Sequence, residues 1–406
     1  MFKLPIQSDF SIHNLPFGIF STVGSPKRIG VALGDRVIDL YALGKLGVWD
    51  FDIDVLKQDS LNSFIALGKS KTNGVRKSIR EWFLDLKNAP FEDFNNISVS
   101  LAEVDLHLPV QVGDYTDFYS SLEHATNVGK MFRDPEQPLL PNWKHLPVGY
   151  HGRASTIIPS GQPIRRPKGQ ILAVSEDLPR FGPTQRLDFE LEMGFIVGKE
   201  NRLGESISTA EAEEYIFGLV LCNDWSARDI QKWEYVPLGP FLGKSFATSI
   251  SPWVIPLEAL DPFRVDGPIQ DPTPLPYLQY SGLKNYDIHL EVHLEPQGHP
   301  PSLICQSNFK YMYWNMAQQL THHTSNGCQI RVGDLMASGT LSGKTPDSYG
   351  SLLELSWGGK NPLPLNGGAS RTFLEDGDSL HLSAYAENKE IRVGFGSLSN
   401  TILPSL

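Results

Sequence analysis

The sequence predicts a mostly β protein with some α+β elements, arranged as a small N-terminal domain and a larger C-terminal one. The 36 glycines and 30 prolines are spread along all 406 residues and favour many short strands and turns over long helices. The segment Leu187–Val197 alternates apolar and acidic residues, which is the period of a β-strand. The chain is also too long for one ordinary core, so two domains of unequal size are expected.

Composition excludes several classes of function. The net charge of −11 argues against nucleic-acid binding, which needs a basic surface. Because an acidic surface repels anions, an anionic substrate would need a local basic pocket. Three scattered cysteines, Cys222, Cys305 and Cys328, are too few for a disulfide framework and indicate reduced thiols. Residues 1–24 hold no apolar core of signal-peptide length, and no apolar run would span a bilayer. We therefore expect a cytoplasmic enzyme or binding protein without a membrane partner.

The predicted N-terminal domain covers residues 1–108, and the C-terminal domain covers residues 109–406. Arg28–Leu40 predicts two short strands around a Gly-Asp turn. Lys77–Lys87 predicts a short helix with one apolar face. Polar and aromatic residues become dense after residue 109, so the C-terminal domain is expected to carry the chemistry.

A histidine and an aspartate lie close together early in the C-terminal domain. A capping-box spacing from Ser120 and a stop at Gly129 predict a helix over Ser121–Val128. His124 falls within this helix, and Asp117 lies on the segment that enters it. A carboxylate near a histidine suits a metal ligand beside a general base. The alternative is a histidine on the helix surface and an ordinary turn aspartate.

Three acidic residues follow one another on the predicted strand Leu187–Val197. Asp188, Glu190 and Glu192 would share one face, with roughly 6.6 Å between successive members. Like charges at this spacing destabilise a strand, and a hard divalent cation bound by carboxylate oxygens would remove that cost. The alternative is an exposed acidic edge.

A buried strand and a helix follow in the predicted order. We predict a strand over Phe217–Asp224 and a helix over Ser226–Trp233. On this helix, Arg228 and Gln231 share one face because they are three residues apart. A carboxylate at a strand end, followed by a cation and an amide on one helix face, is a suitable oxyanion clamp. A solvated helix capped by Asp224 is the alternative.

Glu354 lies in the apolar segment Ser351–Trp357, which we predict to be a strand. A carboxylate there is costly unless it is paired. His124 is the strongest candidate for its partner.

A glycine-rich stretch surrounds Thr340 but does not form a phosphate loop. The phosphate-loop pattern requires glycine where the chain has Ser338, and Pro346 follows in place of a long helix. A glycine-rich turn that presents Thr340 to a pocket is the better interpretation.

These motifs, taken together, resemble the fumarylacetoacetate hydrolase family. The resemblance covers nearly the whole chain and is strongest from about residue 110 to residue 360. The motifs that carry it are Asp114–Ser121, His124–Gly129, Pro141–Trp143, Leu146–Ser155, Pro163–Pro167, Leu187–Met193, Asn223–Gln231 and Ala337–Thr340. It implies an N-terminal SH3-like barrel domain, a C-terminal mixed β-roll and a homodimer.

The resemblance also implies a role for each candidate residue. The divalent-metal ligands would be Asp117, Glu190, Glu192 and Asp224, with Lys244 and Thr248 around a second, structural magnesium site. His124 would be the general base and Glu354 the acid that orients it, and the groups around the oxyanion would be Arg228, Gln231 and Lys244. The substrate contacts would be Tyr119, Arg133, Tyr150, Gln231, Tyr235 and Thr340.

The activity implied by the resemblance is metal-dependent hydrolysis of a carbon–carbon bond in a small β-diketo acid. The substrate would be 4-fumarylacetoacetate and the products fumarate and acetoacetate, in the last step of tyrosine and phenylalanine catabolism. All-oxygen ligands suit calcium, magnesium and manganese alike. Two alternatives stay open: a related acylpyruvate hydrolase or decarboxylase, and a metal-binding scaffold without activity. The presence of both His124 and Glu354 argues against the scaffold.

Overall fold

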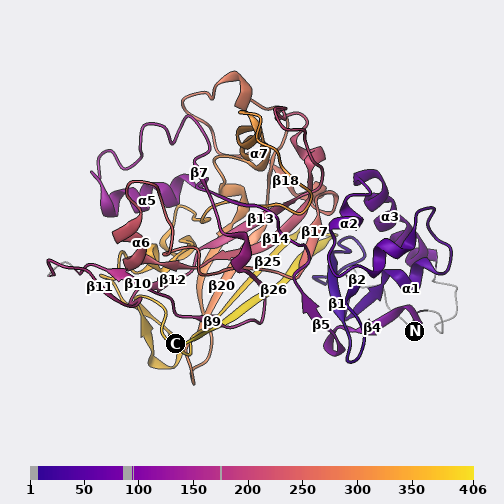
Figure 1. Cartoon of the computed structure of the whole chain (residues 1–406), viewed down its shortest axis with the longest axis horizontal. Coiled ribbons are helices and arrows are strands. Elements are labelled where there is room, and N and C mark those ends of the chain that lie inside the picture. Colours follow the sequence, from indigo (N-terminus) through magenta and orange to yellow (C-terminus); the bar gives the residue numbers. More distant parts are fainter. Residues whose placement is uncertain (1–7, 86–93, 95, 174–175) are drawn as a thin grey trace.

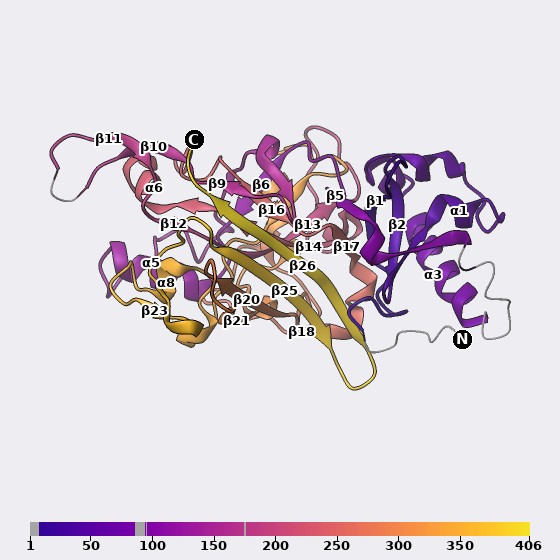
Figure 2. The same cartoon turned by 90° about the horizontal axis from the view of Figure 1, so that it is seen from below.

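The computed structural model of the chain describes residues 8–85, 94, 96–173 and 176–406. Its fold is mostly β with a few helices, as predicted. The elements of residues 17–107 lie together at one end of the molecule, and the others form a larger body (Figure 1). Seen from below, the long strands β25 (Ser379–Glu387) and β26 (Arg392–Leu403) run through this body toward the N-terminal end (Figure 2). Among the described residues, every helix is too short or too polar to cross a membrane.

The N-terminal part packs short strands against helices. Its elements are β1 (Phe17–Ser21), β2 (Arg28–Leu33), β3 (Arg36–Asp39), α1 (Leu40–Gly44), α2 (Asn62–Ile65), α3 (Lys69–Asp85), β4 (Ser98–Ser100) and β5 (Asp105–His107). The predicted strand pair over Arg28–Leu40 is confirmed, because β2 and β3 pair on either side of Gly34, whose φ of 63° suits glycine. Helix α3 begins at Lys69, earlier than predicted, because Val75 extends the buried stripe of Ile79 and Phe83 by one turn. The predicted helix end at Lys87 lies outside the described residues.

A large sheet joins both parts of the chain. Its main path runs in the order β4-β3-β2-β1-β17-β14-β13-β22-β6-β7, with β5, β16 and β8 attached at its sides. Its C-terminal members are β6 (Tyr115–Phe118), β7 (Gly149–His151), β8 (Ile157–Pro159), β13 (Leu191–Val197), β14 (Ile216–Asp224), β16 (Thr248–Ile250), β17 (Trp253–Pro256) and β22 (Leu335–Ala337). The predicted strand Phe217–Asp224 is thus confirmed as β14.

The N-terminal strands do not close into a barrel within the described part of the chain. Strand β1 pairs with β2 and β5, and it also pairs with β17, with Phe17 opposite Val254. The strands therefore continue into the large sheet, and the SH3-like barrel is not confirmed. The domain boundary between residues 108 and 109 stays a prediction.

A second sheet and several helices complete the larger body. The sheet has the order β21-β20-β25-β26-β9 and adds β9 (Ile164–Arg165), β20 (His289–Glu295) and β21 (Ser302–Asn308) to the two long strands. The α-helices are α5 (Leu122–Phe132), α6 (Arg228–Glu234), α7 (Met316–Thr324) and α8 (Leu352–Leu355). Two-stranded pairs are formed by β10 (Lys168–Ile171) with β11 (Arg180–Pro183), β12 (Leu187–Asp188) with β15 (Ser226–Ala227), β18 (Arg264–Val265) with β19 (Asn285–Tyr286), and β23 (Leu363–Pro364) with β24 (Ser370–Arg371).

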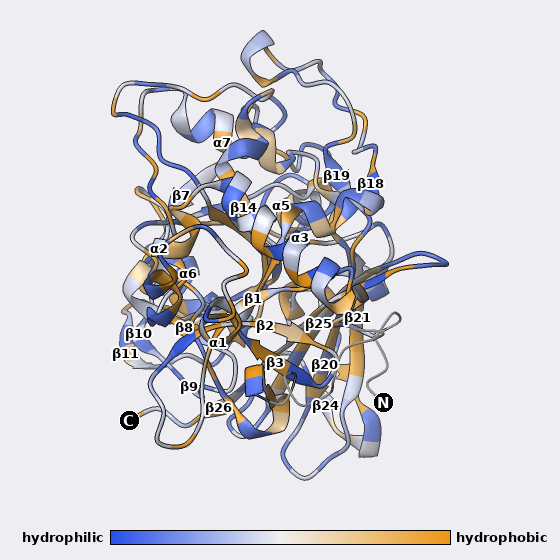
Figure 3. Ribbon diagram, turned by 90° about the vertical axis from the view of Figure 1, so that its right-hand side faces the viewer, coloured by the Kyte–Doolittle hydropathy of each residue, from blue (hydrophilic) through white to orange (hydrophobic). Residues whose placement is uncertain are grey.

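Apolar residues cover both faces of the central strands. In β14, Leu219 and Leu221 belong to the core shared with the second sheet, whereas Phe217 and Val220 belong to the core shared with the N-terminal part. Figure 3 shows hydrophobic colour along the strands and hydrophilic colour mainly in outer loops and helices. Strand β14 is therefore buried on both faces up to its last residue, Asp224, which explains its nearly continuous apolar run.

Candidate active site

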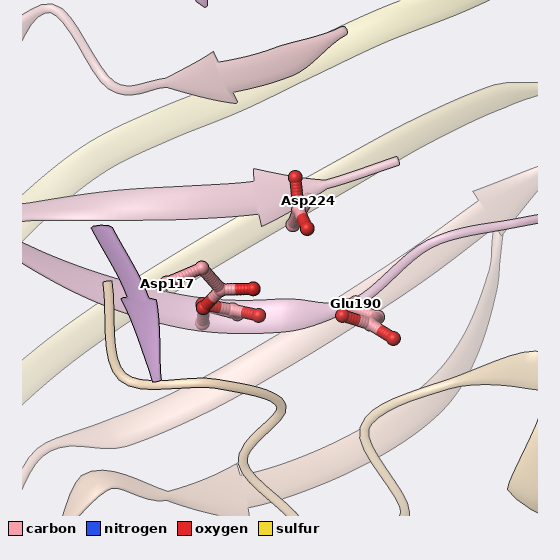
Figure 4. A group of neighbouring side chains, drawn as sticks. Asp117, Glu190 and Asp224 are labelled. Carbon is pink, nitrogen blue, oxygen red and sulfur yellow. The ribbon is translucent and has the colours of Figure 1, made fainter. Parts of the chain in front are cut away.

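Four buried carboxylates meet at the end of the central strands and are called the acidic cluster below. One oxygen each of Asp117, Glu190, Glu192 and Asp224 lies within 4.8 Å of the others. Asp117 comes from β6 and Asp224 from the end of β14, while Glu190 directly precedes β13 (Figure 4). Glu192 belongs to β13. Strands β14, β13, β22 and β6 are successive neighbours in the sheet, so the fold gathers residues that are far apart in the sequence.

The predicted single half-buried strand over Leu187–Val197 is wrong. The structure has two strands instead, because β12 ends at Asp188 and β13 begins at Leu191. Asp188 lies outside the acidic cluster, although it shares Arg228 with Glu190. The alternative of an exposed acidic edge is also wrong, since the three carboxylate residues expose at most 6% of their surface.

The carboxyl groups of the acidic cluster differ in the direction of their pKa shifts. Burial and neighbouring carboxylates raise the pKa of Asp117 and of Glu192 well above the usual range. Burial acts in the same direction on Glu190, but Lys244 and Arg228 outweigh it and lower the pKa of that carboxyl group. Asp117 Oδ1 and Glu192 Oε1 are buried without a hydrogen-bond partner among the described residues. Burying an unpaired carboxyl oxygen lowers the stability of the fold. Hard divalent cations bind carboxylate oxygens, so the four residues of the acidic cluster fit such a cation.

Donors surround the other side of the acidic cluster. Lys244 Nζ donates to Glu190 Oε2 at 2.5 Å and to Asp224 Oδ2 at 2.8 Å. Thr248 Oγ1 and Tyr150 Oη donate to Asp224 at 2.6 and 2.9 Å. An ammonium group has donors only, so the Lys244 side chain balances carboxylate charge here and offers no lone pair to a cation. The second magnesium site around Lys244 and Thr248 stays a prediction.

Arg228 is buried between two carboxylates. Its Nε donates to Asp188 Oδ2 at 2.8 Å, and its Nη1 donates to Glu190 Oε1 at 2.7 Å and to Gln231 Oε1 at 3.3 Å. Its Nη2 is buried and has no partner within the described residues. One guanidinium donor is therefore left for an anionic group.

The predicted helix around Arg228 is confirmed with a later start. Helix α6 begins at Arg228 because Ser226 and Ala227 pair with β12 as strand β15. Arg228 and Gln231 contact each other on one face, as their spacing predicts. The alternative in which Asp224 caps this helix is wrong, since Ala227 occupies the N-cap position without a side-chain hydrogen bond.

His124 and Glu354 form the expected buried pair. His124 Nδ1 lies 2.7 Å from Glu354 Oε2, and Glu354 also accepts from Asn127, Ser342 and Ser351 at 2.9, 2.9 and 3.0 Å. Burial alone would raise the pKa of Glu354, but His124 and these hydrogen bonds lower it overall. A carboxylate only accepts, so Nδ1 carries the proton of the neutral imidazole, and Nε2 is the acceptor in that form.

The helix that carries His124 differs from its prediction at both ends. Ser121, and not Ser120, is the N-cap of α5, and its hydroxyl accepts from His124 N at 3.3 Å. The helix continues past Gly129 to Phe132. Glycine is needed at 129 for a close approach, since a Cβ there would lie 2.1 Å from Pro138 O. His124 is only 3% exposed, so a histidine on the helix surface is also wrong.

The predicted strand over Ser351–Trp357 is wrong. Leu352–Leu355 form helix α8, with Ser351 as N-cap and its hydroxyl accepting from Glu354 N at 3.3 Å. The Ser-Leu-Leu-Glu spacing of a capping box was the signal that could have predicted this helix. Sequence reasoning also missed Asn127, Ser342 and Ser351 as partners of Glu354, because no local pattern joins these segments.

The predicted substrate contacts fall into two groups. Tyr119 and Tyr150 are half-buried, with the Tyr119 ring 5.3 Å from the His124 ring, and Thr340 is buried with no hydrogen-bond partner for its hydroxyl among the described residues. Arg133 and Tyr235 lie at the surface, and Tyr235 follows the end of α6. A cavity of about 150 Å³ adjoins the acidic cluster and is lined in part by Tyr150, Asp224, Lys244 and Thr248.

Comparison with known proteins gives consistent matches over nearly the whole chain. Residues 114–403 match the family model described as fumarylacetoacetate (FAA) hydrolase C-terminal, and residues 13–109 match the one described as fumarylacetoacetase N-terminal. The chain is 53% identical to human fumarylacetoacetase over 409 residues, covering 98% of this chain and 97% of the human protein. It is 49% identical to the fumarylacetoacetase of Caenorhabditis elegans, covering 99% and 98% of the two chains. Among solved structures, a fumarylacetoacetate hydrolase from Exiguobacterium antarcticum has a similar fold, with a TM-score of 0.55, 20% identity and coverage of 96% and 99%.

Proposed function

The chain belongs to the fumarylacetoacetate hydrolase family, and from this premise we propose that it hydrolyses a carbon–carbon bond of 4-fumarylacetoacetate, giving fumarate and acetoacetate. This reaction is the last step of tyrosine and phenylalanine catabolism. The observation that carries the proposal is the buried His124–Glu354 pair, with His124 on the helix that follows β6, together with the four convergent carboxylates to which β6 contributes Asp117.

A divalent cation in the acidic cluster is part of this proposal. Asp117, Glu190, Glu192 and Asp224 would hold it, and the unpaired oxygens of Asp117 and Glu192 support this assignment. When bound, the cation would polarise the carbonyl oxygens of a β-diketone. Calcium, magnesium and manganese all suit these oxygen ligands.

His124 acts as general base in the proposed reaction. With Nδ1 held by Glu354, Nε2 takes a proton from a water molecule, and the resulting hydroxide attacks a substrate carbonyl carbon. Collapse of the oxyanion then breaks the adjacent carbon–carbon bond, its electron pair leaves as the enolate of acetoacetate, and that enolate carbon takes up the proton held by His124. His124 lies on α5, the helix that follows β6, and β6 carries Asp117, which supports the closeness of the base to the acidic cluster. Glu354 keeps the imidazole in one tautomer and balances its charge once the proton has been taken.

Arg228, Lys244 and Gln231 stabilise the oxyanion that this attack creates. The free Nη2 of Arg228 supports this role, since a buried donor without a partner gains most from a new negative charge. Tyr119, Tyr150 and Thr340 would contact the substrate from within the site, and Arg133 and Tyr235 from its surface. Two buried cations give the local positive potential that an anionic substrate needs on an acidic protein.

We also propose a homodimer. Val236, Leu238 and Phe241, in the loop after α6, are 65%, 97% and 67% exposed, which supports an interface there. Sedimentation velocity on the wild-type protein would test the assembly, and a monomer at all concentrations would contradict it.

Turnover measurements test the function directly. The purified protein, supplied with Mg²⁺ or Ca²⁺, is expected to cleave fumarylacetoacetate with a higher kcat/KM than any acylpyruvate. Loss of the diketone absorbance and release of fumarate provide the readout. A clear preference for acylpyruvates would instead support the related hydrolase activity.

Metal affinity tests the choice of ligands. Glu190→Gln and Glu192→Gln are each expected to weaken metal binding by about 10–100-fold or more, because each removes a charged ligand. Asp188→Asn is expected to change it little, since Asp188 bonds Arg228 and lies outside the acidic cluster. Calorimetric titration with Mg²⁺ and Mn²⁺ measures all three. Loss of metal uptake in Asp188→Asn alone would show that the ligand assignment is wrong.

A further inference from the structure

One buried carboxylate outside the acidic cluster touches both halves of the proposed site. Asp188 is 0% exposed and uses both oxygens. Its Oδ2 accepts from Arg228 Nε at 2.8 Å and from Leu353 N at 3.0 Å. Its Oδ1 accepts from Leu352 N at 2.8 Å and from Phe189 N at 2.9 Å. Leu352 and Leu353 are the first two residues of α8, the helix that carries Glu354.

Two hydrogen-bonded chains therefore start from the same carboxyl group. One runs through Arg228 to the free guanidinium donor at Nη2. The other runs through the first turn of α8 to Glu354, which bonds His124 Nδ1 at 2.7 Å. A four-residue helix has little stability of its own, so its orientation depends on such tertiary contacts.

We propose that Asp188 is a positioning residue that holds Arg228 and helix α8 in a fixed relation, so that the oxyanion donor and the orienter of the base share one anchor. The proposal rests on the proposed function and adds to it a residue that is neither base nor metal ligand. Loss of this anchor leaves Glu190 as the carboxylate partner of Arg228 and removes the oxygens that accept from the Leu352 and Leu353 backbone N–H groups at the start of α8. Both catalytic groups would then lose their fixed geometry.

Asp378 offers a matched control. It is also a 0% exposed aspartate, and it accepts from Arg371 Nε and Nη2 at 2.9 Å each and from the backbone of Glu375 at 2.8 Å. It directly precedes β25, in the second sheet, and belongs to neither the acidic cluster nor the His124–Glu354 pair. Asp378→Asn therefore removes a comparable buried ion pair without changing the proposed anchor.

The first measurement separates kcat from KM and from metal binding. Asp188→Asn is expected to lower kcat by about 10–100-fold, in the range of groups that orient a catalytic residue. Its KM and its affinity for Mg²⁺ are expected to stay within about threefold of wild type, because ground-state contacts are kept. Asp378→Asn is expected to lower the melting temperature comparably while kcat stays near wild type. Equal losses of kcat in the two variants would overturn the proposal, because they would reflect general destabilisation.

Double-mutant cycles give the decisive test. Asp188→Asn should lower kcat by a smaller factor in an Arg228→Gln background, and in a Glu354→Gln background, than in the wild type, since each background already lacks one of the two residues through which it acts. Additive losses in either background would overturn the shared-anchor role. If Asp188→Asn does not fold, Asp188→Glu takes its place in the same cycles, and failure of both to fold would assign Asp188 to stability alone. A wild-type protein that binds Mg²⁺ but cleaves no diketone would contradict the proposed function, whereas a failed cycle in an active enzyme contradicts only this inference.

Discussion

His124→Ala is expected to lower the rate of diketone hydrolysis by about two to four orders of magnitude, the usual contribution of a positioned general base. The free Nε2 of a buried, oriented imidazole is the proton acceptor in the proposed reaction, and alanine leaves none. Metal affinity should survive, because His124 is not part of the acidic cluster. Steady-state kinetics at saturating Mg²⁺, with calorimetric metal titration, make the measurement.

Glu354→Gln should lower the rate of diketone hydrolysis less than His124→Ala does. The amide keeps an oxygen for His124 Nδ1–H but loses the negative charge that favours this tautomer and offsets the imidazolium. The double variant should be little slower than His124→Ala alone, since residues that act as a unit are strongly non-additive.

His381 provides the control for this series. It also pairs with a carboxylate, Glu295 Oε2 at 3.0 Å, but it lies on β25 of the second sheet and is partly exposed. His381→Ala should leave kcat near wild type. Additive losses for His124 and Glu354 would show that the pair does not work as a unit, and an active His124→Ala enzyme would exclude it as the base.

Sequence patterns predicted those features of the site that depend on local order. The apolar run that ends at Asp224 identified β14, because a strand buried on both faces needs continuous hydrophobicity. The three-residue spacing of Arg228 and Gln231 likewise predicted their contact on α6. The contact between His124 and Glu354 was expected because a buried carboxylate needs a partner, and the structure confirms it.

Features that depend on tertiary contacts were predicted poorly. Helix α8 has four residues, and an apolar segment of that length gives no period that separates helix from strand. The break between β12 and β13 is equally invisible in the alternation of Leu187–Val197, although Asp188 before it bonds the start of α8 and Glu190 after it belongs to the acidic cluster. Period-2 reasoning predicted one continuous strand and could not show that Asp188 contacts α8.

Removal of the divalent cation is expected to abolish activity and to destabilise the fold. Four buried carboxyl groups would then be left together, which costs either charge repulsion or proton uptake, and the oxygens of Asp117 and Glu192 would lose their partner. At a metal concentration of about 100 times Kd, binding to the folded state alone stabilises it by about 2.7 kcal/mol. Exhaustive chelation followed by assay, thermal unfolding and metal add-back measures both effects. Full activity in a verified metal-free sample would end the metal hypothesis.

The stability of the metal-free protein should fall as pH rises. Burial and neighbouring carboxylates raise the pKa of Asp117 and Glu192 in the folded state, so above the usual carboxyl range the folded protein holds protons that the unfolded chain has released. The free energy of unfolding then decreases with pH until both groups have ionised, and the stabilisation gained from added metal increases over the same interval. Thermal unfolding between about pH 5 and about pH 8, with and without Mg²⁺, shows both trends.

The Glu192→Gln variant should be more stable than the wild type without metal and less stable than the wild type with metal. Without metal, the amide replaces a buried ionisable group whose Oε1 has no hydrogen-bond partner among the described residues, while the amide oxygen can still accept from Gly339 N, a contact of 3.0 Å in the wild type. At about pH 8 the metal-free variant should therefore be more stable than wild type, by about 1–3 kcal/mol if the full desolvation cost is relieved. In excess Mg²⁺ the wild type should be the more stable protein, because the variant has lost a charged ligand. A variant that is less stable under both conditions would show that Glu192 stabilises the fold without a cation, and the acidic cluster would then need another explanation.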